Sequence, residues 1–181
     1  QQEEDRNSAP PAPPTGSTPF APPAEENDQG NNNVPDTELA IAARRGQTAT
    51  VRRLLESSAA TVDELSGEAG FSALMYAAWY GQTVTVRALL QAKASVDLRS
   101  RLGHTALMAA AWNGHTATVQ ALLQASASVD LRSNGKAGFS ALMYAAWYGH
   151  TAIVRALLQA KASVDLQSKL GYTALMVAAW N

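Results

Sequence analysis

The sequence contains no cysteine, so it carries no information about the redox compartment in which the protein works. No apolar run reaches the roughly 20 residues that a membrane-spanning helix needs, and we therefore expect no membrane insertion. A recognisable signal peptide is also missing, although the chain begins at Gln1 and not at Met. We expect either a mature form after signal removal or a fragment. The compartment stays open between cytoplasmic and secreted or periplasmic.

Proline is missing from most of the chain, because all eight prolines lie within residues 1–35. This segment holds six acids against one arginine, a net charge of −5, whereas residues 36–181 hold 13 bases against nine acids, a net charge of +4. With one Phe and one Val, residues 1–35 have too little apolar surface to offset the entropy of ordering them, which predicts a disordered, acidic, Pro-rich tail. The Pro10-x-x-Pro13 spacing also suits a proline-reading domain, but it arises by chance in any proline-rich segment.

Catalytic constellations are missing as well. Of the three histidines, His115 and His150 recur at one position before a helix, and we expect His104 to be an exposed turn residue. The recurring Asp97, Asp130 and Asp165 indicate hydrogen bonding within turns, and none of these groups pairs with a base at a useful spacing. A phosphate-binding glycine loop is not present either. The sequence therefore predicts a non-enzymatic protein without a cofactor or a metal.

What the sequence does contain is repetition. The segment GFSALMYAAWYG occupies residues 70–81 and returns at 138–149, and over the longer stretches 70–98 and 138–166, 26 of 29 positions are identical. The four tryptophans, Trp79, Trp112, Trp147 and Trp180, are separated by 33, 35 and 33 residues. Such a period is the signature of stacked structural units, none of which can bury its apolar residues alone.

Each unit carries two helical patterns. In the first, Leu74, Ala77 and Ala78 share one face, and a Ser or Thr such as Ser72 stands before it as an N-cap. In the second, Val86, Leu89 and Leu90 form the apolar stripe. A glycine between the two patterns is expected to end one helix and open the next.

These units resemble ankyrin repeats over residues 36–181. The stretch GHTALMAAAWNGHTATVQALLQASASVD (103–130) carries the family motif in its order of elements. The matching positions are Gly103, Thr105, Leu107, Ala110, Ala111, Gly114, His115, Val119, Leu122, Leu123, Ala127 and Val129. The resemblance implies an all-α ankyrin-repeat solenoid of helix-turn-helix units joined by turns, with units at about 36–70, 71–103, 104–138 and 139–171 and a half unit at 172–181.

The sequence departs from the family pattern at three positions of each unit. Ala replaces the family proline before the first-helix Leu, and Met replaces the family histidine after it. Lys93, Ser126 and Lys161 replace the glycine after the second helix, and each destabilises the array by about 1 kcal/mol or more if the backbone there stays left-handed. The more polar first unit suits an N-terminal cap. The last unit ends at Asn181, so we expect a truncated repeat that leaves Leu175, Ala178 and Ala179 uncovered.

The resemblance places the functional residues on a concave face, formed by the turn tips and the last residues of each first helix. Aromatic residues flanked by arginine have the composition of protein-binding hot spots. We therefore expect a monomeric protein–protein interaction module. The open alternatives are single-stranded nucleic-acid binding, which the weak net charge of +4 supports poorly, and a purely structural array in which the tryptophans only pack on one another. The candidate partner-binding residues are Phe71, Trp79, Tyr80, Arg99, Arg101, Leu102, His104, Trp112, Asn113, Arg132, Phe139, Trp147, Tyr148, Tyr172 and Trp180.

Overall fold

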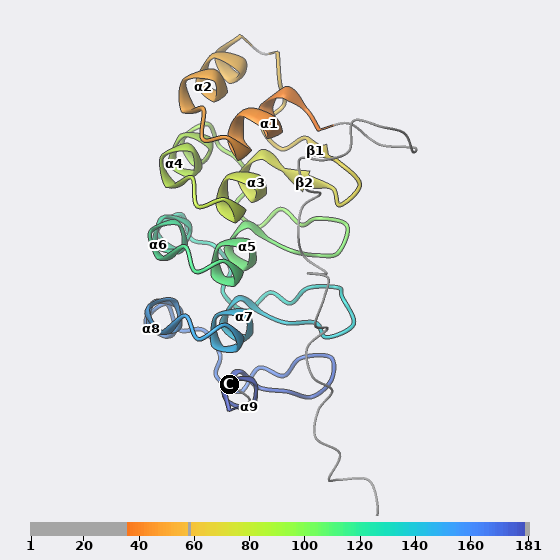
Figure 1. Cartoon of the computed structure of the whole chain (residues 1–181), viewed down its shortest axis with the longest axis vertical. Helices are drawn as coiled ribbons and strands as arrows, with labels where there is room; N and C mark the ends of the chain where they lie inside the picture. The colour runs from red at the N-terminus through yellow and green to blue at the C-terminus, as the bar shows by residue number, and fades with distance from the viewer. Residues whose placement is uncertain (1–35, 58, 180–181) are drawn as a thin grey trace, which may run out of the picture.

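Two rows of short helices are stacked along one axis in the computed structural model, which describes residues 36–57 and 59–179. The inner row lies between the outer row and a set of projecting hairpins (Figure 1). The predicted tail and Trp180 lie outside the described residues. The inner row consists of α1 (Glu38–Arg44), α3 (Ala73–Trp79), α5 (Ala106–Trp112), α7 (Ala141–Trp147) and α9 (Ala174–Ala178). The outer row consists of α2 (Thr48–Glu56), α4 (Thr83–Gln91), α6 (Thr116–Gln124) and α8 (Thr151–Gln159).

Each inner helix begins where the sequence predicts. The Ser72 hydroxyl accepts a hydrogen bond from the backbone N–H of Met75 at 3.3 Å, and Thr105 caps α5 in the same way. These bonds satisfy amides that have no partner within the first turn. At the other end of α3, Gly81 adopts a φ of 67°, which reverses the chain into α4 and confirms the predicted role of this glycine.

The inner helices are buried more completely than the sequence pattern predicts. In α3 the residues from Ala73 to Ala78 are all buried, including Met75 and Tyr76, which lie off the predicted Leu74–Ala78 face. The reason is that α3 packs against α1 on one side, α5 on the other and α4 behind it. Alanine makes this possible, because small side chains let helix axes approach closely.

Outer helices bury only part of the predicted stripe, because Leu90 is half-buried and its equivalent in α8, Leu158, is 41% exposed. Val86 and Leu89 of α4 are fully buried, and Val119 and Leu122 of α6 occupy the same positions one unit later. Threonine hydroxyls also connect neighbouring outer helices, with Thr83 Oγ1 lying 2.8 Å from Thr118 Oγ1.

Hairpins connect one unit to the next. The first contains a short antiparallel ladder of β1 (Leu65–Ser66) and β2 (Phe71–Ser72), and a single bridge between Arg132 and Ser140 repeats this pairing later. The sequence predicted turns here and no ladder. Two of the recurring aspartates form hydrogen bonds between units and not within a turn as predicted: Asp97 Oδ1 accepts from the Ser128 backbone N–H at 2.9 Å, and Asp130 Oδ1 from that of Ser163 at 2.8 Å.

Three residues other than glycine adopt the left-handed conformation after the outer helices. Lys93, Ser126 and Lys161 have φ values of 67°, 63° and 64°. The structure therefore confirms that the backbone keeps the turn that glycine makes in the family pattern. A side chain in this region destabilises the fold by about 1–2 kcal/mol.

The last inner helix has one apolar side uncovered. Leu175 of α9 is 79% exposed, whereas Leu74 at the equivalent position of α3 is 1% exposed. Ala178 and Ala179 are exposed too, as the sequence predicts.

Candidate functional site

Two histidines fix the ends of the inner helices. Nε2 of His115 lies 2.9 Å from the Trp79 carbonyl oxygen, and Nε2 of His150 lies 3.0 Å from that of Trp112. Each bond joins the start of an outer helix to the end of the inner helix of the preceding unit, α6 to α3 and α8 to α5. The two histidines therefore have a structural role, and they hold in place the residues that carry the indole rings.

The tryptophans line the ends of the inner helices together with other aromatic rings. The Trp79 and Trp112 ring centroids are 6.2 Å apart, Trp112 and Tyr148 are 5.0 Å apart, and Phe139 and Trp147 are 6.0 Å apart. We name these five residues the aromatic strip. The three indoles are half-buried, with Trp79 and Trp112 packed against the hydrophobic core, while Tyr148 is 42% exposed.

The strip therefore combines the two interpretations that the sequence left open. Its rings touch across units, which is the structural ladder, and they also keep part of their surface exposed. Trp79 lies off the Leu74–Ala78 face, so the helical pattern places it outside the core; this prediction is wrong, because the indole packs on the core cluster. The neighbouring Tyr80 is 37% exposed.

Two of the candidate residues are buried. His104 is 4% exposed and Phe71 is 2% exposed, so the prediction that His104 is an exposed turn residue is wrong. The reason is the adjoining unit: the Tyr144 hydroxyl lies 3.3 Å from Nε2 of His104. Burial, together with the positive charge of Arg99, lowers the pKa of His104 from 6.5 to about 3, and burial raises the pKa of Tyr144 to about 12.

The hairpins form one continuous ridge beside the strip. The backbone N–H groups of Arg101, Asn134 and Lys169 donate to the carbonyl oxygens of Ala69, Leu102 and Ala137, at 3.1, 2.7 and 2.9 Å. Each of these bonds joins one hairpin to the next. The ridge adjoins the aromatic strip because Phe139, which contacts Trp147, lies at the end of the third hairpin.

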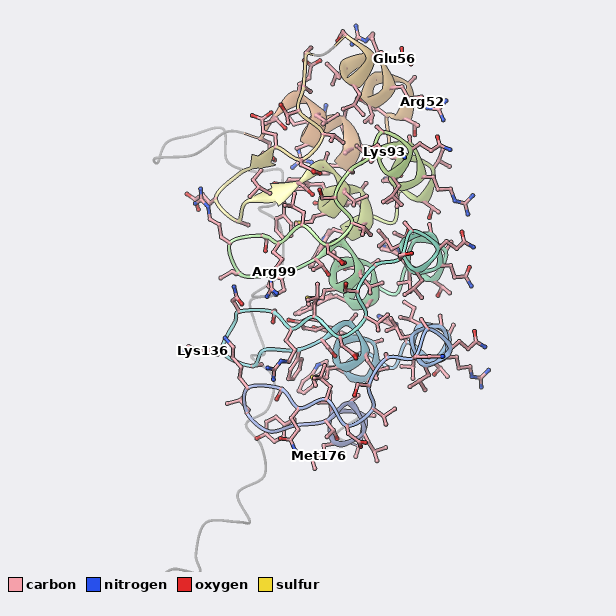
Figure 2. The ribbon with its side chains drawn as sticks, turned by 180° about the vertical axis from the view of Figure 1, so that it is seen from behind. Arg52, Glu56, Lys93, Arg99, Lys136 and Met176 are labelled. Atoms are coloured by element: carbon pink, nitrogen blue, oxygen red, sulfur yellow. The ribbon has the colours of Figure 1, made fainter. Side chains whose placement is uncertain are left out.

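Basic side chains follow this ridge. An Arg99 guanidinium nitrogen (Nη2) donates to the Arg132 carbonyl oxygen at 2.6 Å, Nη1 of Arg132 to the Gln167 carbonyl at 2.6 Å, and Lys169 Nζ to the Asn134 carbonyl at 2.8 Å. Figure 2 shows Arg99 and Lys136 on the hairpin side, opposite Arg52 of the outer row. We name Arg99, Arg101, Arg132, Lys136 and Lys169 the basic edge.

The carbonyl bonds position these side chains without neutralising their charge. Within residues 36–57 and 59–179, the recorded ion pair joins Arg44 to Asp36 at 3.6 Å, in the first unit. Residues 98–105, 131–140 and 166–173 of the second, third and fourth hairpins contain no acidic residue, and one aspartate stands directly before each range. The basic edge is therefore a strip of positive charge.

The remaining candidates are divided among these surfaces. Leu102 is exposed on the ridge, with 45% of its surface accessible, as is Leu170 of the fourth hairpin, with 51%. Tyr172 and Asn113 are half-buried, and the Asn113 amide donates back to the Ala109 carbonyl at 3.1 Å. The described part of the chain contains no group of three or more metal-binding side chains and no helix long and apolar enough to cross a membrane.

Comparison with known families agrees with this geometry. A family model described as ankyrin repeats (3 copies) matches residues 22–100, 39–134 and 107–181. The chain belongs to the ankyrin-repeat family. A comparison with curated proteins gives no match. Ankyrin repeats are generally protein–protein interaction modules and are typically non-enzymatic.

Sequence reasoning missed the polar contacts that lie between ankyrin units. It did not find the Tyr144–His104 pair, nor the equivalent bond of 2.7 Å that Tyr76 donates to Asp36 Oδ1. The sequence did contain a signal for these contacts. Tyr76 stands 40 positions after Asp36, and Tyr144 stands 40 positions after His104. In both pairs the polar residue directly precedes the N-cap of the inner helix in the preceding unit.

Proposed function

We propose that the protein binds another protein through the aromatic strip and the adjoining basic edge. The observation that carries this proposal is the half-exposed state of three indoles in one row, next to Tyr148, which is 42% exposed. Aromatic residues and arginine are the residues most enriched among binding hot spots. Preorganisation supports it further, because the hydrogen bonds of His115 and His150 fix the helix ends before any partner arrives.

A purely structural array is the second candidate, and the ring contacts between units favour it. In that case the exposed parts of the strip contribute nothing to binding. The two candidates differ at Tyr80 and Tyr148, whose exposure exceeds a third. Replacing these side chains removes exposed aromatic surface and leaves the buried contacts of Trp112 with Tyr144 in place.

The test compares two full-length variants in affinity capture. The strip variant combines Tyr148→Ser in the strip with Tyr80→Ser, next to Trp79 of the strip. The matched control is Val84→Ser with Leu158→Ser, which removes apolar surface that is 66% and 41% exposed on the outer row. We expect the strip variant to lose bound proteins that the control retains, while both keep the helical circular dichroism signal of the parent chain. Equal capture by the two variants would contradict the proposal.

Nuclease treatment separates protein binding from nucleic-acid binding in the same experiment. Proteins captured directly stay bound after the treatment. Phosphate contacts would instead give a steep loss of affinity with salt. Capture that disappears with nuclease would assign the surface to nucleic acid.

A further inference from the structure

The basic edge and the acidic residues 1–35 belong to one chain, and their chemistry is complementary. The three consecutive hairpin segments 98–105, 131–140 and 166–173 carry five basic residues and no acid, against the one aspartate that precedes each segment. Residues 1–35 carry the acids Glu3, Glu4, Asp5, Glu25, Glu26 and Asp28 against one arginine. We infer that this N-terminal segment docks in cis along the basic edge and the aromatic strip, and competes there with the partner.

The order of charges along the ridge supports this occupant. The first hairpin, next to Asp36, carries the exposed acids Glu64 and Glu68, whereas the next three hairpins are basic. An acidic segment that leaves the array at Asp36 is therefore repelled by the nearest hairpin and attracted by the more distant ones. The ridge is continuous through its backbone hydrogen bonds, so the attraction extends over neighbouring units.

The prolines of the N-terminal segment also suit the aromatic strip. Seven of its eight prolines lie between the two acidic groups, from Pro10 to Pro23. Proline-rich segments bind aromatic-lined surfaces, because proline loses little conformational freedom on docking. With both acidic groups on the basic edge, the prolines and Phe20 lie beside the half-exposed indoles.

Chain length permits this path. Thirty-five residues span at most about 115–125 Å when fully extended. The hairpins to be reached lie three units from the first, or about 30 Å at the spacing of packed helices. Covalent connection also raises the effective concentration of the segment to the millimolar range, so weak contacts suffice.

The chain offers a clean way to measure this contact. Because it has no cysteine, Ser17→Cys gives a single site for a nitroxide spin label on the full-length protein. In the ¹⁵N-labelled chain we expect broadened amides in hairpins 98–105, 131–140 and 166–173 and broadened indole signals of Trp112 and Trp147. The amides of α4, α6 and α8 should keep their intensity. Raising the salt from 0.1 to 1 M shortens the Debye length from about 10 to about 3 Å, and should remove most of the broadening.

Two variants test the charge complementarity. Neutralising the segment should abolish the broadening, and Arg101→Gln with Lys136→Gln should reduce it, because both side chains are exposed on the edge. The control, Arg52→Gln with Arg155→Gln on the outer row, should leave it unchanged. Broadening that is equal on both rows, confined to the first unit, or retained after neutralisation would overturn the inference. The neutralised segment carries Glu3→Gln, Glu4→Gln, Asp5→Asn, Glu25→Gln, Glu26→Gln and Asp28→Asn.

A mixed sample distinguishes a cis from a trans contact. When spin-labelled chains without ¹⁵N are added to ¹⁵N chains without a spin label, we expect no broadening. Broadening in this mixture would show that the segment binds a second copy and would overturn the cis arrangement. The inference rests on the proposed binding surface, but its test uses no partner. If the spin label causes no broadening while the strip variant still loses captured proteins, only the docking of the segment is disproved. If the label broadens the expected signals while the strip variant and its control capture equally, the proposed function is disproved.

Discussion

The Tyr144 hydroxyl lies 3.3 Å from Nε2 of His104, across the boundary between two units. The Tyr76 hydroxyl bonds Asp36 at the equivalent place, at 2.7 Å. At the other two boundaries between units, the residue before the N-cap is Phe71 or Phe139, and the tyrosine position of the next inner helix holds Ala109 or Val177. A tyrosine thus follows a unit with a polar residue before its N-cap, and a smaller side chain at the same position follows a unit with a phenylalanine there. This complementarity explains why the closest repeat lies two units away.

Buried His104 should make the fold sensitive to acid. Because folding lowers the pKa of His104 from 6.5 to about 3, the unfolded chain binds more protons than the folded chain between these values. Stability therefore rises with pH through this window and is lost as the pH falls below about 6.5, by up to about 1.4 kcal/mol per pH unit. Urea unfolding at neutral pH and at a pH near 4.5 measures this loss. The variant His104→Asn should show a smaller loss over the same interval, and an equal loss would disprove the assignment.

Replacing the His104–Tyr144 contact by the Phe–Ala combination of the preceding boundary should show that the two positions are energetically coupled. His104→Phe alone places a larger ring against Tyr144 and should destabilise by about 1–3 kcal/mol. Tyr144→Ala alone leaves a cavity and should destabilise by about 3–5 kcal/mol. The double variant reproduces the combination of Phe71 and Ala109. Its loss of stability should therefore be about 1–2 kcal/mol smaller than the sum of the losses in the two single variants. Additive effects in a double-mutant cycle would show that side-chain volume does not determine which residue pair occupies each boundary between units.

Glycine at the left-handed positions should stabilise the array. Lys93→Gly and Lys161→Gly each remove a side chain from a φ of 67° or 64°. We expect a gain of about 0.5–1 kcal/mol per site, since relief of strain exceeds the added freedom of the unfolded chain. The control is Ala92→Gly, at a φ of −79°, which should destabilise instead. Thermal unfolding measures the stability of the three variants. A lower stability of Lys93→Gly than of the parent chain would contradict the prediction.

Local patterns in the sequence predicted the elements well. The N-caps, the glycines and the outer stripe of Val86 and Leu89 depend on residues within one turn of a helix, and the structure confirms them. Contacts between units were harder to predict. Met75 and Tyr76 are buried by neighbouring inner helices, which a pattern confined to α3 does not reveal.

In the candidate site, too, features within one unit were predicted from the sequence, whereas contacts between units were not. The sequence identified the row of indoles, but His104 is buried because a tyrosine from the next unit covers it. The carbonyl partners of Arg99 and Arg132 likewise come from the next hairpin. The assignment of the strip and the edge to partner binding stays a prediction, as do the unit boundaries.

The bond between His115 and the Trp79 carbonyl should stabilise the array and order the indole. Removing it by His115→Ala leaves a half-buried carbonyl without this hydrogen bond and should destabilise by about 1–2 kcal/mol. His115→Gln should lose less, because Gln82 fills the equivalent position in the preceding unit and its Nε2 lies 3.4 Å from the Arg44 carbonyl. The measurement is chemical unfolding together with the line width of the Trp79 indole signal, which should broaden in the Ala variant and stay narrow in the Gln variant. Equal stability of both variants and the parent chain would mean that packing, and not this bond, holds the end of α3.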